Sequence, residues 1–189
     1  QVVSLQDNTS RSQYQLEPQL ITNLSDRNRE KRRLVRFPDI PKVMVNAVLA
    51  AEDKRFFQHV GLDPIRLVKA VYVDVREGRK GQGASTLSQQ LARMFWLDLE
   101  KRWTRKLAEA LITLQIEQKL SKEQIFEDYA NEIYLGWRGA FRIHGFGEAS
   151  QAYFGKDLTQ ITLPEAATLA GMIQRPAVFD PYKHPDRTR

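Results

Sequence analysis

The chain has 189 residues, 42% of them hydrophobic, so it can form a substantial core and is not a disordered segment. A formal charge of +6 indicates an anionic partner, such as a nucleic acid, an acidic membrane surface or a phosphorylated substrate. Cysteine is absent, which excludes disulfides and thiolate metal sites. No apolar run reaches the ~18 residues of a membrane span, no secretion signal opens the chain, and we expect a piece of a longer protein.

The N-terminal part predicts a polar lead-in. Residues 1–38 lack helical periodicity, so we expect short extended pieces with turns there, followed by one domain over residues 39–189. The lead-in ends in a basic run, Arg29 to Arg36, which fits a solvated edge as well as a contact with a membrane or a partner.

Two helices are predicted next. Asp39 is expected to cap the first helix, whose apolar face is formed by Val43, Ala47 and Ala51. The second helix is expected from Pro64 to about Val75, and the sequence "GRKGQGAS" then predicts a loop.

Three capping-box patterns predict further helix starts, because Ser or Thr at the cap and Gln or Glu three residues later satisfy free backbone N–H groups. The pairs are Thr86 with Gln89, Ser121 with Gln124, and Thr162 with Glu165. The helix after Ser121 is expected to run to Gly136, and the last helix to cover residues 163–172.

Residues 100–120 predict a long amphipathic helix. The arc expected to be buried contains Trp103, Leu107, Ala110, Leu111 and Leu114. Because strand signals are few, the predicted class is mainly α, with a minor β element near the N-terminus.

Glu52 and Asp53 form a carboxylate pair at the end of the otherwise apolar first helix. The negative end of the helix dipole, the neighbouring charge and partial burial all raise the pKa of a carboxyl group, which suits a general base working near neutral pH. A surface ion pair with Lys54 or Arg55 is the simpler interpretation, and this segment alone favours it.

The residues that follow this pair are less specific. Phe56 and Phe57 are more typical of core anchors than of substrate contacts. His59, in an H-x-G turn, fits packing as well as an imidazole presented to a cleft.

The segment "GQGASTLSQQLAR", residues 81–93, has the features of an anion site, since a glycine-containing loop leads into a capped helix. On that helix Thr86, Gln90 and Arg93 fall within about 60° of one another. This stripe fits a phosphate-binding face and an ordinary polar face equally well. The spacing excludes a Walker loop and a dinucleotide-binding glycine motif.

A third candidate lies in "KRWTRKLAEAL", where Arg102, Arg105, Lys106 and Glu109 share one helical arc. A single pair between Arg105 and Glu109 contributes only ~0.3–0.5 kcal/mol, and three cations around one acid exceed what it requires. Such a group can hold a diphosphate while lowering the pKa of Glu109, which would separate the roles of the two carboxylates. Further on, Asn131 and Tyr134 can orient a sugar, although packing and C-capping suit them better.

Taken together, four ordered motifs resemble the peptidoglycan glycosyltransferase domain of class A penicillin-binding proteins. E-D-x-x-F-x-x-H-x-G stands as Glu52, Asp53, Phe56, His59 and Gly61, and G-G-S-T-x-x-Q-Q stands as "GASTLSQQ" with Ala84 replacing the second glycine. R-K-x-x-E stands as Arg105, Lys106 and Glu109, and K-x-x-I-x-x-x-Y-x-N as Lys122, Ile125, Tyr129 and Asn131. The later sequences "YFGK" and "EAATLAGM" also match.

The resemblance implies a lysozyme-like fold with a larger head lobe and a smaller apolar jaw lobe that dips into a membrane. It implies polymerisation of lipid II into β-1,4-linked glycan strands, with undecaprenyl diphosphate as the leaving group. The upstream "EPQLITNLSDRNREKR" resembles the lead-in of bifunctional members, so a membrane anchor and a transpeptidase domain are expected outside this chain.

Site roles follow from the same resemblance. Glu52 is expected to deprotonate the 4-hydroxyl of the acceptor, which attacks the donor's anomeric carbon with inversion, and Asp53 is expected to support it. Glu109 would order the cations, contact the donor diphosphate, or hold a divalent metal. The diphosphate-binding residues are expected to be His59, Ser85, Thr86, Gln90, Arg93, Arg105 and Lys106. Asn131, Tyr134 and Phe56 are the candidates for orienting sugars.

The implied partners are lipid II, the growing glycan strand, a membrane surface and other cell-wall synthesis proteins, with no nucleic acid. No cofactor is required, and a Mg²⁺ or Mn²⁺ ion at the diphosphate is left open. The implied location is the periplasmic face of the bacterial inner membrane, with this chain a soluble fragment. Residues 61–75 and 94–97 are expected to supply an exposed apolar patch, with ordinary core packing as the alternative.

Two rival functions remain at this stage. A lytic muramidase on the same scaffold needs an acidic catalyst and a sugar cleft, but no cation cluster, because its leaving group is uncharged. A nucleic-acid-binding module would explain the net charge, but the cations alternate with acids and no groove-reading motif is present.

Overall fold

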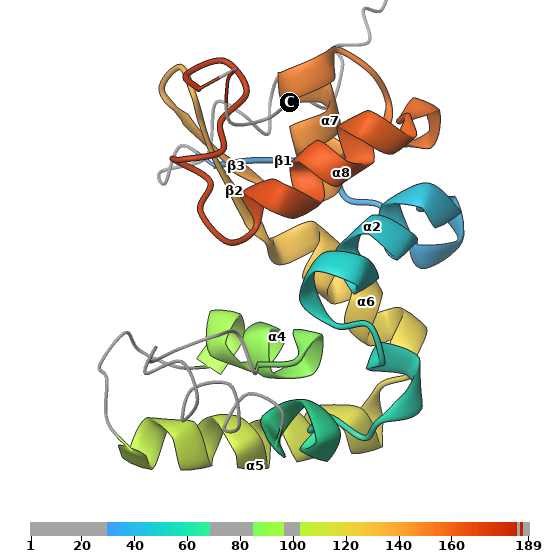
Figure 1. Cartoon of the computed structure of the whole chain (residues 1–189), viewed down its shortest axis with the longest axis vertical. Helices are drawn as coiled ribbons and strands as arrows, with labels where there is room; N and C mark the ends of the chain where they lie inside the picture. The colour runs from blue at the N-terminus through green and yellow to red at the C-terminus, as the bar shows by residue number, and fades with distance from the viewer. Residues whose placement is uncertain (1–29, 69–84, 97–102, 185, 187–189) are drawn as a thin grey trace, which may run out of the picture.

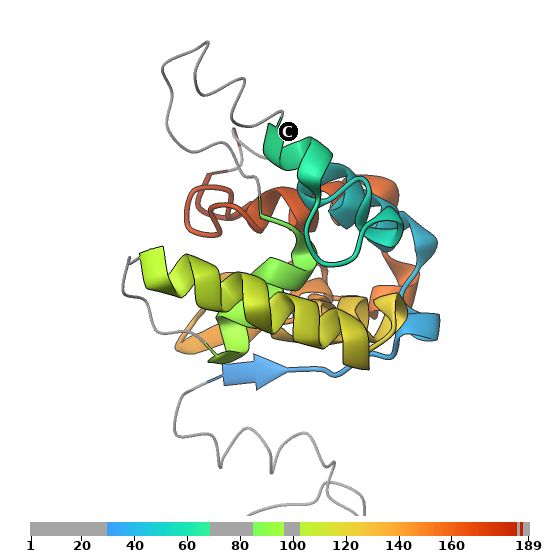
Figure 2. The ribbon, with the colours of Figure 1, turned by 90° about the horizontal axis from the view of Figure 1, so that it is seen from below.

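The computed structural model describes residues 30–68, 85–96, 103–184 and 186, and these are mainly helical, as predicted. Two lobes are visible in Figure 1, joined by α6 (Lys122–Glu132). The lower lobe holds α4 (Leu87–Trp96), α5 (Trp103–Lys119) and the helical residues 64–68. The upper lobe holds α2 (Lys42–Glu52), α7 (Phe146–Phe154), α8 (Leu163–Met172) and a small sheet. Seen from below in Figure 2, α5 lies across α4.

The sheet is more extensive than the sequence indicated. β1 (Glu30–Arg32) pairs in parallel with β3 (Phe141–His144), which pairs antiparallel with β2 (Tyr134–Arg138). The helix expected to reach Gly136 therefore ends at Glu132, and that prediction is wrong. Pairing with β3 outweighs local helix propensity here, and Gly139 turns the hairpin with a φ of 59° that suits glycine.

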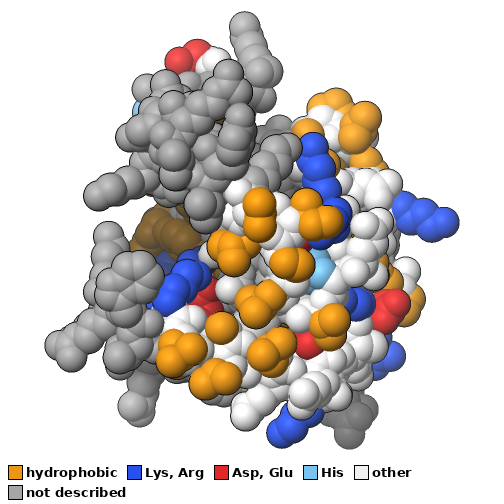
Figure 3. Space-filling model, turned by 60° about the horizontal axis from the view of Figure 1, so that its bottom comes forward, with side chains coloured by type: hydrophobic (Ala, Val, Ile, Leu, Met, Phe, Trp, Pro, Cys, Tyr) orange, Lys and Arg blue, Asp and Glu red, His pale blue; other side chains and the backbone are white. Residues whose placement is uncertain are grey.

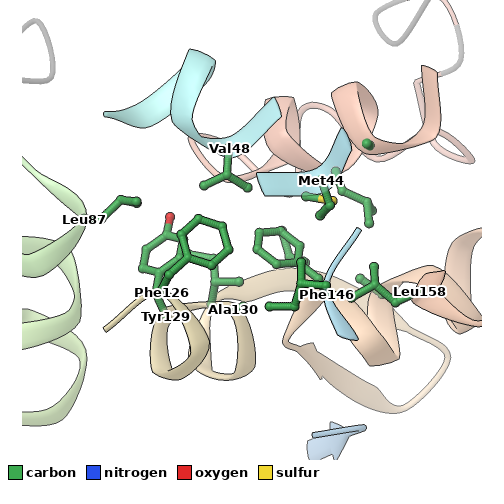
Figure 4. Packing of buried hydrophobic residues seen from close by; sticks show 14 of the residues in the cluster. Met44, Val48, Leu87, Phe126, Tyr129, Ala130, Phe146 and Leu158 are labelled. Atoms are coloured by element: carbon green, nitrogen blue, oxygen red, sulfur yellow. The ribbon is translucent and has the colours of Figure 1, made fainter. Parts of the chain in front are cut away.

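Helix α2 buries a different face from the predicted one. Met44, Val48 and Glu52 are its buried residues, whereas Ala51 is exposed and Val43 and Ala47 are only partly buried. Because α2 is apolar on nearly all sides, its own sequence does not determine which face is buried, and packing against α8 does. Figure 4 shows Met44 and Val48 facing Phe126 of α6 and Phe146 of α7. The buried stripe of α2 therefore ends in the carboxylate of Glu52.

Helix α5 also turns a different face inward. Glu109, Thr113 and Ile116 are buried, whereas Leu107 is 65% exposed and Leu111 is 57% exposed. Leu114 is exposed and Ala110 is partly buried, so the prediction of the buried arc is wrong. The structure does not describe the side chain of Trp103. The buried face is the one that meets α4 and residue 61.

The three capping boxes are confirmed at Thr86, Ser121 and Thr162. The cap predicted at Asp39 is not, because Asp39 ends the 3-10 turn η1 (Phe37–Asp39) and Pro41 occupies the N-cap position of α2. Residues 64–68 form the start of the predicted second helix, whose continuation to Val75 and most of the following loop lie outside the described residues.

Two short 3-10 turns complete the described elements. η2 (Phe56–Gln58) follows α2 in the chain, and η3 (Leu158–Gln160) lies between α7 and α8. The end of the lead-in joins the domain here as well, since the Val35 backbone exchanges two hydrogen bonds with the side chain of Asn131. None of the helices in the described ranges has the length and apolar character required to cross a bilayer.

Candidate active site

Glu52 lies at the C-terminal end of α2 with only 7% of its surface exposed. Its Oε2 accepts a hydrogen bond of 2.8 Å from Nε2 of Gln90 on α4. Its Oε1 is buried and has no hydrogen-bond partner among the described residues. A buried carboxylate oxygen without a donor is costly in a folded protein, so it marks a position where a ligand can supply the missing contact.

Asp53 joins α2 to the start of α4. It is 1% exposed and accepts hydrogen bonds from the backbone N–H of Leu87 at 3.1 Å and from Nε2 of His59 at 3.0 Å. Arg66 approaches its Oδ1 at 3.7 Å and also donates to the backbone carbonyl of Glu52. Asp53 therefore connects the end of α2 with the start of α4 and with His59, and its carboxylate is already bound.

Thr86, the residue before α4, is tied to Gly61. The Thr86 side chain is fully buried, and its hydroxyl donates to the carbonyl of Gly61 at 2.5 Å. Gly61 has a φ of 77°, and a Cβ there would lie 2.8 Å from Cγ2 of Thr113 on α5. Thr86 and His59, both predicted to bind diphosphate, thus point their side chains into the protein, and the same is true of Gln90.

Glu109 is the second buried carboxylate, with no exposed surface. Its Oε1 accepts from Nζ of Lys106, which also reaches Oγ of Ser85 at 3.4 Å. Its Oε2 and Nε of Arg105 are buried without a hydrogen-bond partner in the part of the chain that the structure describes. Ser85, Lys106 and Glu109 are therefore in contact, whereas no such contact is seen for Arg105 among the described residues, and Arg102 lies outside them.

The two carboxylates are linked through α4. Gln90 of α4 holds Glu52, and Ser85, just before α4, contacts the cation that holds Glu109. Glu52 also lines a cavity of about 500 Å³ together with Lys54, Arg55 and Arg66. Figure 3 shows charged side chains of both signs in a hollow that borders a field of apolar side chains.

Several candidate residues serve packing instead. Phe56 is fully buried against Phe126, with ring centroids 6.3 Å apart, so it cannot orient a sugar, and that prediction is wrong. Phe57, expected in the core, is 45% exposed because it follows the single buried position of the η2 turn. The side-chain amide of Asn131 is hydrogen-bonded to the backbone N–H and C=O of Val35. Tyr134 lies opposite His144 in the hairpin, with ring centroids 5.4 Å apart.

Tyr129, a residue of the K-x-x-I-x-x-x-Y-x-N motif, lies beside Gln90, a position that its motif does not predict. It is fully buried on α6, and its hydroxyl lies 3.4 Å from Oε1 of Gln90. Burial and the nearby Glu52 charge raise its pKa well above the ordinary value, with a smaller opposing effect from Arg93. Nothing in the spacing of a tyrosine on an amphipathic helix distinguishes such a contact from core packing.

Two groups of side chains contain carboxylates that could face a divalent metal ion. Asp53, His59 and Asp63 have ligand atoms within 4.8 Å of one another, but the guanidinium groups of Arg66 and Arg55 already neutralise the two carboxylates. The strong hydrogen bond from Arg55 holds the pKa of Asp63 below its ordinary value. Carboxylates that are already paired with guanidinium groups leave little negative charge to bind a divalent cation.

Glu109 does not fit a resident metal either. It offers one free oxygen, Oε2, beside the cations Lys106 and Arg105. A magnesium site needs several oxygen ligands, and the neighbouring positive charges oppose it. The positive charge that a metal would supply to an anionic ligand is already present in these two side chains.

Comparison with known proteins agrees with this geometry. The family described as transglycosylase matches residues 17–189. The chain is 39% identical to penicillin-binding protein 1B of Vibrio cholerae over 188 residues, covering 100% of the chain and 24% of that protein. It is 46% identical to penicillin-binding protein 1A of Neisseria lactamica over 160 residues, covering 85% of the chain and 20% of that protein. It is 38% identical to penicillin-binding protein 1B of Haemophilus influenzae over 173 residues, covering 92% of the chain and 22% of that protein.

The chain thus spans about a quarter or less of the length of these relatives. Its mainly helical, two-lobed architecture agrees with the lysozyme-like fold expected from the motifs. From the matched family and from the levels of identity, the chain belongs to the transglycosylase family and is an enzyme domain of the type carried by penicillin-binding proteins 1A and 1B.

Proposed function

We propose that this domain polymerises lipid II into β-1,4-linked glycan strands of peptidoglycan, with Glu52 as the general base. The observation that carries the proposal is the pair of buried carboxylates, each with one bound and one free oxygen among the described residues. Glu52 is held by a neutral amide and Glu109 by a cation. This is the division expected between a proton acceptor and a carboxylate that orders cations for an anionic ligand.

The proposed step is a single inverting displacement. Glu52 removes the proton from the 4-hydroxyl of the acceptor, whose oxygen forms a bond to the donor's anomeric carbon. The bond from that carbon to the diphosphate oxygen breaks, and undecaprenyl diphosphate leaves with the electron pair. The protonated Glu52 then returns its proton to solvent, which restores the carboxylate for the next addition.

The cations serve the leaving group. Lys106, Arg105 and Arg93 are proposed to neutralise the diphosphate as negative charge builds on it, with Ser85 adding a hydroxyl donor. Glu109 orders these side chains, since its Oε1 already binds Lys106. The diphosphate chemistry accounts for a cluster of positive charge that an uncharged leaving group would not need.

We also propose that the lower lobe rests on the membrane that holds the lipid substrate, at the periplasmic face of the inner membrane. Exposed apolar side chains gather on its underside (Figure 3). Leu107 and Leu111 of α5 and Ile65, Leu67 and Val68 of the 64–68 helix are each more than half exposed. These segments adjoin, because Gly61 packs on Thr113 of α5. An apolar field of this kind fits an acyl-chain boundary.

The proposal is tested by incubating the domain with lipid II and, separately, with purified cell wall. Glycan polymer is expected from lipid II, with no muropeptides released from the wall. Glu52→Gln should abolish the polymer while circular dichroism and melting temperature stay unchanged. Substantial polymer from Glu52→Gln would remove Glu52 from the base role, and muropeptide release would favour a lytic muramidase.

A further inference from the structure

We propose that Gln90 and Tyr129 are positioning residues that orient the carboxylate of Glu52, so that Oε1 is the oxygen that accepts the proton. The inference rests on the proposed base role of Glu52. It assigns Gln90 to the carboxylate instead of to a diphosphate, and it gives Tyr129 a part in the reaction.

The direction of each hydrogen bond follows from the chemistry of the groups. An ionised carboxylate only accepts, so Gln90 must turn its Nε2 toward Oε2 of Glu52, at 2.8 Å. Its amide oxygen then faces Tyr129, whose hydroxyl lies 3.4 Å away and must donate. The two hydrogen bonds thus run in one direction: the Tyr129 hydroxyl donates to the Gln90 amide oxygen, and the Gln90 amide nitrogen donates to Glu52.

The surroundings of Tyr129 keep its hydroxyl in the donor role. Its ring is fully buried on α6, and Figure 4 shows its hydroxyl directed away from Ala130 and toward Leu87 at the start of α4. Burial, joined by the Glu52 charge, keeps the hydroxyl protonated at every pH where the enzyme would work, so it stays a donor. Gln90 is itself only 7% exposed, so solvent does not compete for its amide.

The consequence is a distinction between the two oxygens of Glu52. Oε2 is occupied by the amide, whereas Oε1 is left without a donor in the described part of the chain. A base held on one oxygen by a third group presents the other in a fixed direction, as in catalytic triads. In the displacement, the acceptor O–H bond breaks and its proton moves to Oε1, while the freed electron pair forms the new bond to carbon.

The experiment compares three variants of the domain in a lipid II polymerisation assay over a range of pH. Tyr129→Phe keeps the ring and removes only the donor, and Gln90→Leu removes the hydrogen bond to Glu52. Tyr153→Phe is the matched control, because Tyr153 is 2% exposed and its hydroxyl donates to the Leu135 carbonyl at 2.8 Å, away from Glu52. Melting temperatures are recorded for all three.

We expect kcat to fall about 3–10-fold in Tyr129→Phe and about 10–100-fold in Gln90→Leu, with KM for lipid II within about twofold of the wild type. The acid limb of the pH profile should move to higher pH in Gln90→Leu, because a donor to the ionised form is lost. Tyr153→Phe should lower the melting temperature as much as Tyr129→Phe but leave kcat and the acid limb unchanged.

Two outcomes would overturn the inference. One is a Tyr129→Phe variant with wild-type kcat and a Gln90→Leu variant with an unmoved acid limb; the other is an equal loss of kcat in Tyr153→Phe. If Glu52→Gln in the same assay is inactive, such results reject the positioning role alone. If Glu52→Gln is active, the proposed base itself fails.

Discussion

Glu52 at the end of α2 and Glu109 in α5 are alike in burial and opposite in partner. Each carboxylate has one oxygen bound and one free among the described residues. Glu52 is bound by the amide of Gln90, which carries no charge, whereas Glu109 is bound by the ammonium of Lys106. A neutral donor fixes the direction of a carboxylate and leaves it able to take up a proton. A cationic donor stabilises the ionised form and weakens the carboxylate as a base.

Burial alone therefore does not define a catalytic acid or base. The element that contributes the donor decides the role: α4 supplies an amide to Glu52, and α5 supplies its own lysine one turn before Glu109. Exchanging or removing these donors should therefore exchange or remove the roles.

Replacing Gln90 with lysine would give Glu52 the kind of partner that Glu109 has. We expect kcat for lipid II polymerisation to fall about 100-fold, because the ammonium stabilises the ionised carboxylate. The rate at saturating lipid II measures the effect, with circular dichroism as the check on folding. A folded Gln90→Lys domain with a rate within about threefold of the wild type would show that the neutral donor is unimportant.

Lys106→Met removes the cation from Glu109. We expect KM for lipid II to rise about tenfold at low salt and to become less dependent on salt, since one charge that attracts the diphosphate is lost. KM measured at several salt concentrations gives both values. Lys119→Met, at the exposed end of the same helix, is the control and should behave as the wild type. An unchanged salt dependence in Lys106→Met would remove Lys106 from diphosphate binding.

Leu111→Asp places a charge on the exposed face of α5, which is opposite to the face that buries Glu109. Binding to vesicles of phosphatidylglycerol and phosphatidylethanolamine should weaken about tenfold, because burying a leucine side chain contributes ~1.5–3 kcal/mol. Leu163→Asp, at a residue 67% exposed on α8 of the other lobe, is the matched control. Equal vesicle binding by both variants and the wild type would contradict the membrane-facing role of the lower lobe.

Glu165 is a third carboxylate and lies outside the site, so its hydrogen bonds affect stability and not catalysis. Lys156 and the Thr162 cap lower its pKa to about 2, so it contributes stability at neutral pH that is lost as the pH falls from about 4.5 toward 2. Glu165→Gln should therefore reduce the free energy of unfolding by about 1 kcal/mol at pH 7, with no effect on kcat. Urea denaturation at several pH values measures this, and a difference that persists at pH 2 would argue against the ionised group as its source.

Much of the helical framework could be predicted from local sequence. The capping boxes at Thr86, Ser121 and Thr162 are determined by side chains three residues apart, and all three formed as expected. The cluster of Ser85, Lys106 and Glu109 followed from helical spacing and from the motifs. The choice of buried face did not, since α2 is apolar on nearly all sides and α5 carries leucines on the face that packing leaves exposed.

The features that were not predicted, such as β2 and the hydrogen bonds of Gln90, depend on contacts between residues far apart in the sequence. β2 forms because β3 is available to pair, although residues 134–136 continue a helical pattern. Gln90 lies 38 residues from Glu52, and Tyr129 lies 39 residues from Gln90. No spacing rule connects these positions. The spacing of Thr86, Gln90 and Arg93 fits a phosphate-binding face and an ordinary polar face equally well, and it does not indicate that Thr86 and Gln90 are buried inside the protein.

The most direct measurement of the central claim is the pH dependence of kcat for lipid II polymerisation by Glu109→Gln beside the wild type. If Glu52 is the base and Glu109 only orders cations, the variant should be slower at every pH but keep the same acid limb. Loss of the acid limb in Glu109→Gln would identify Glu109 as the group that titrates during the reaction, and the assignment of the two carboxylates would be wrong.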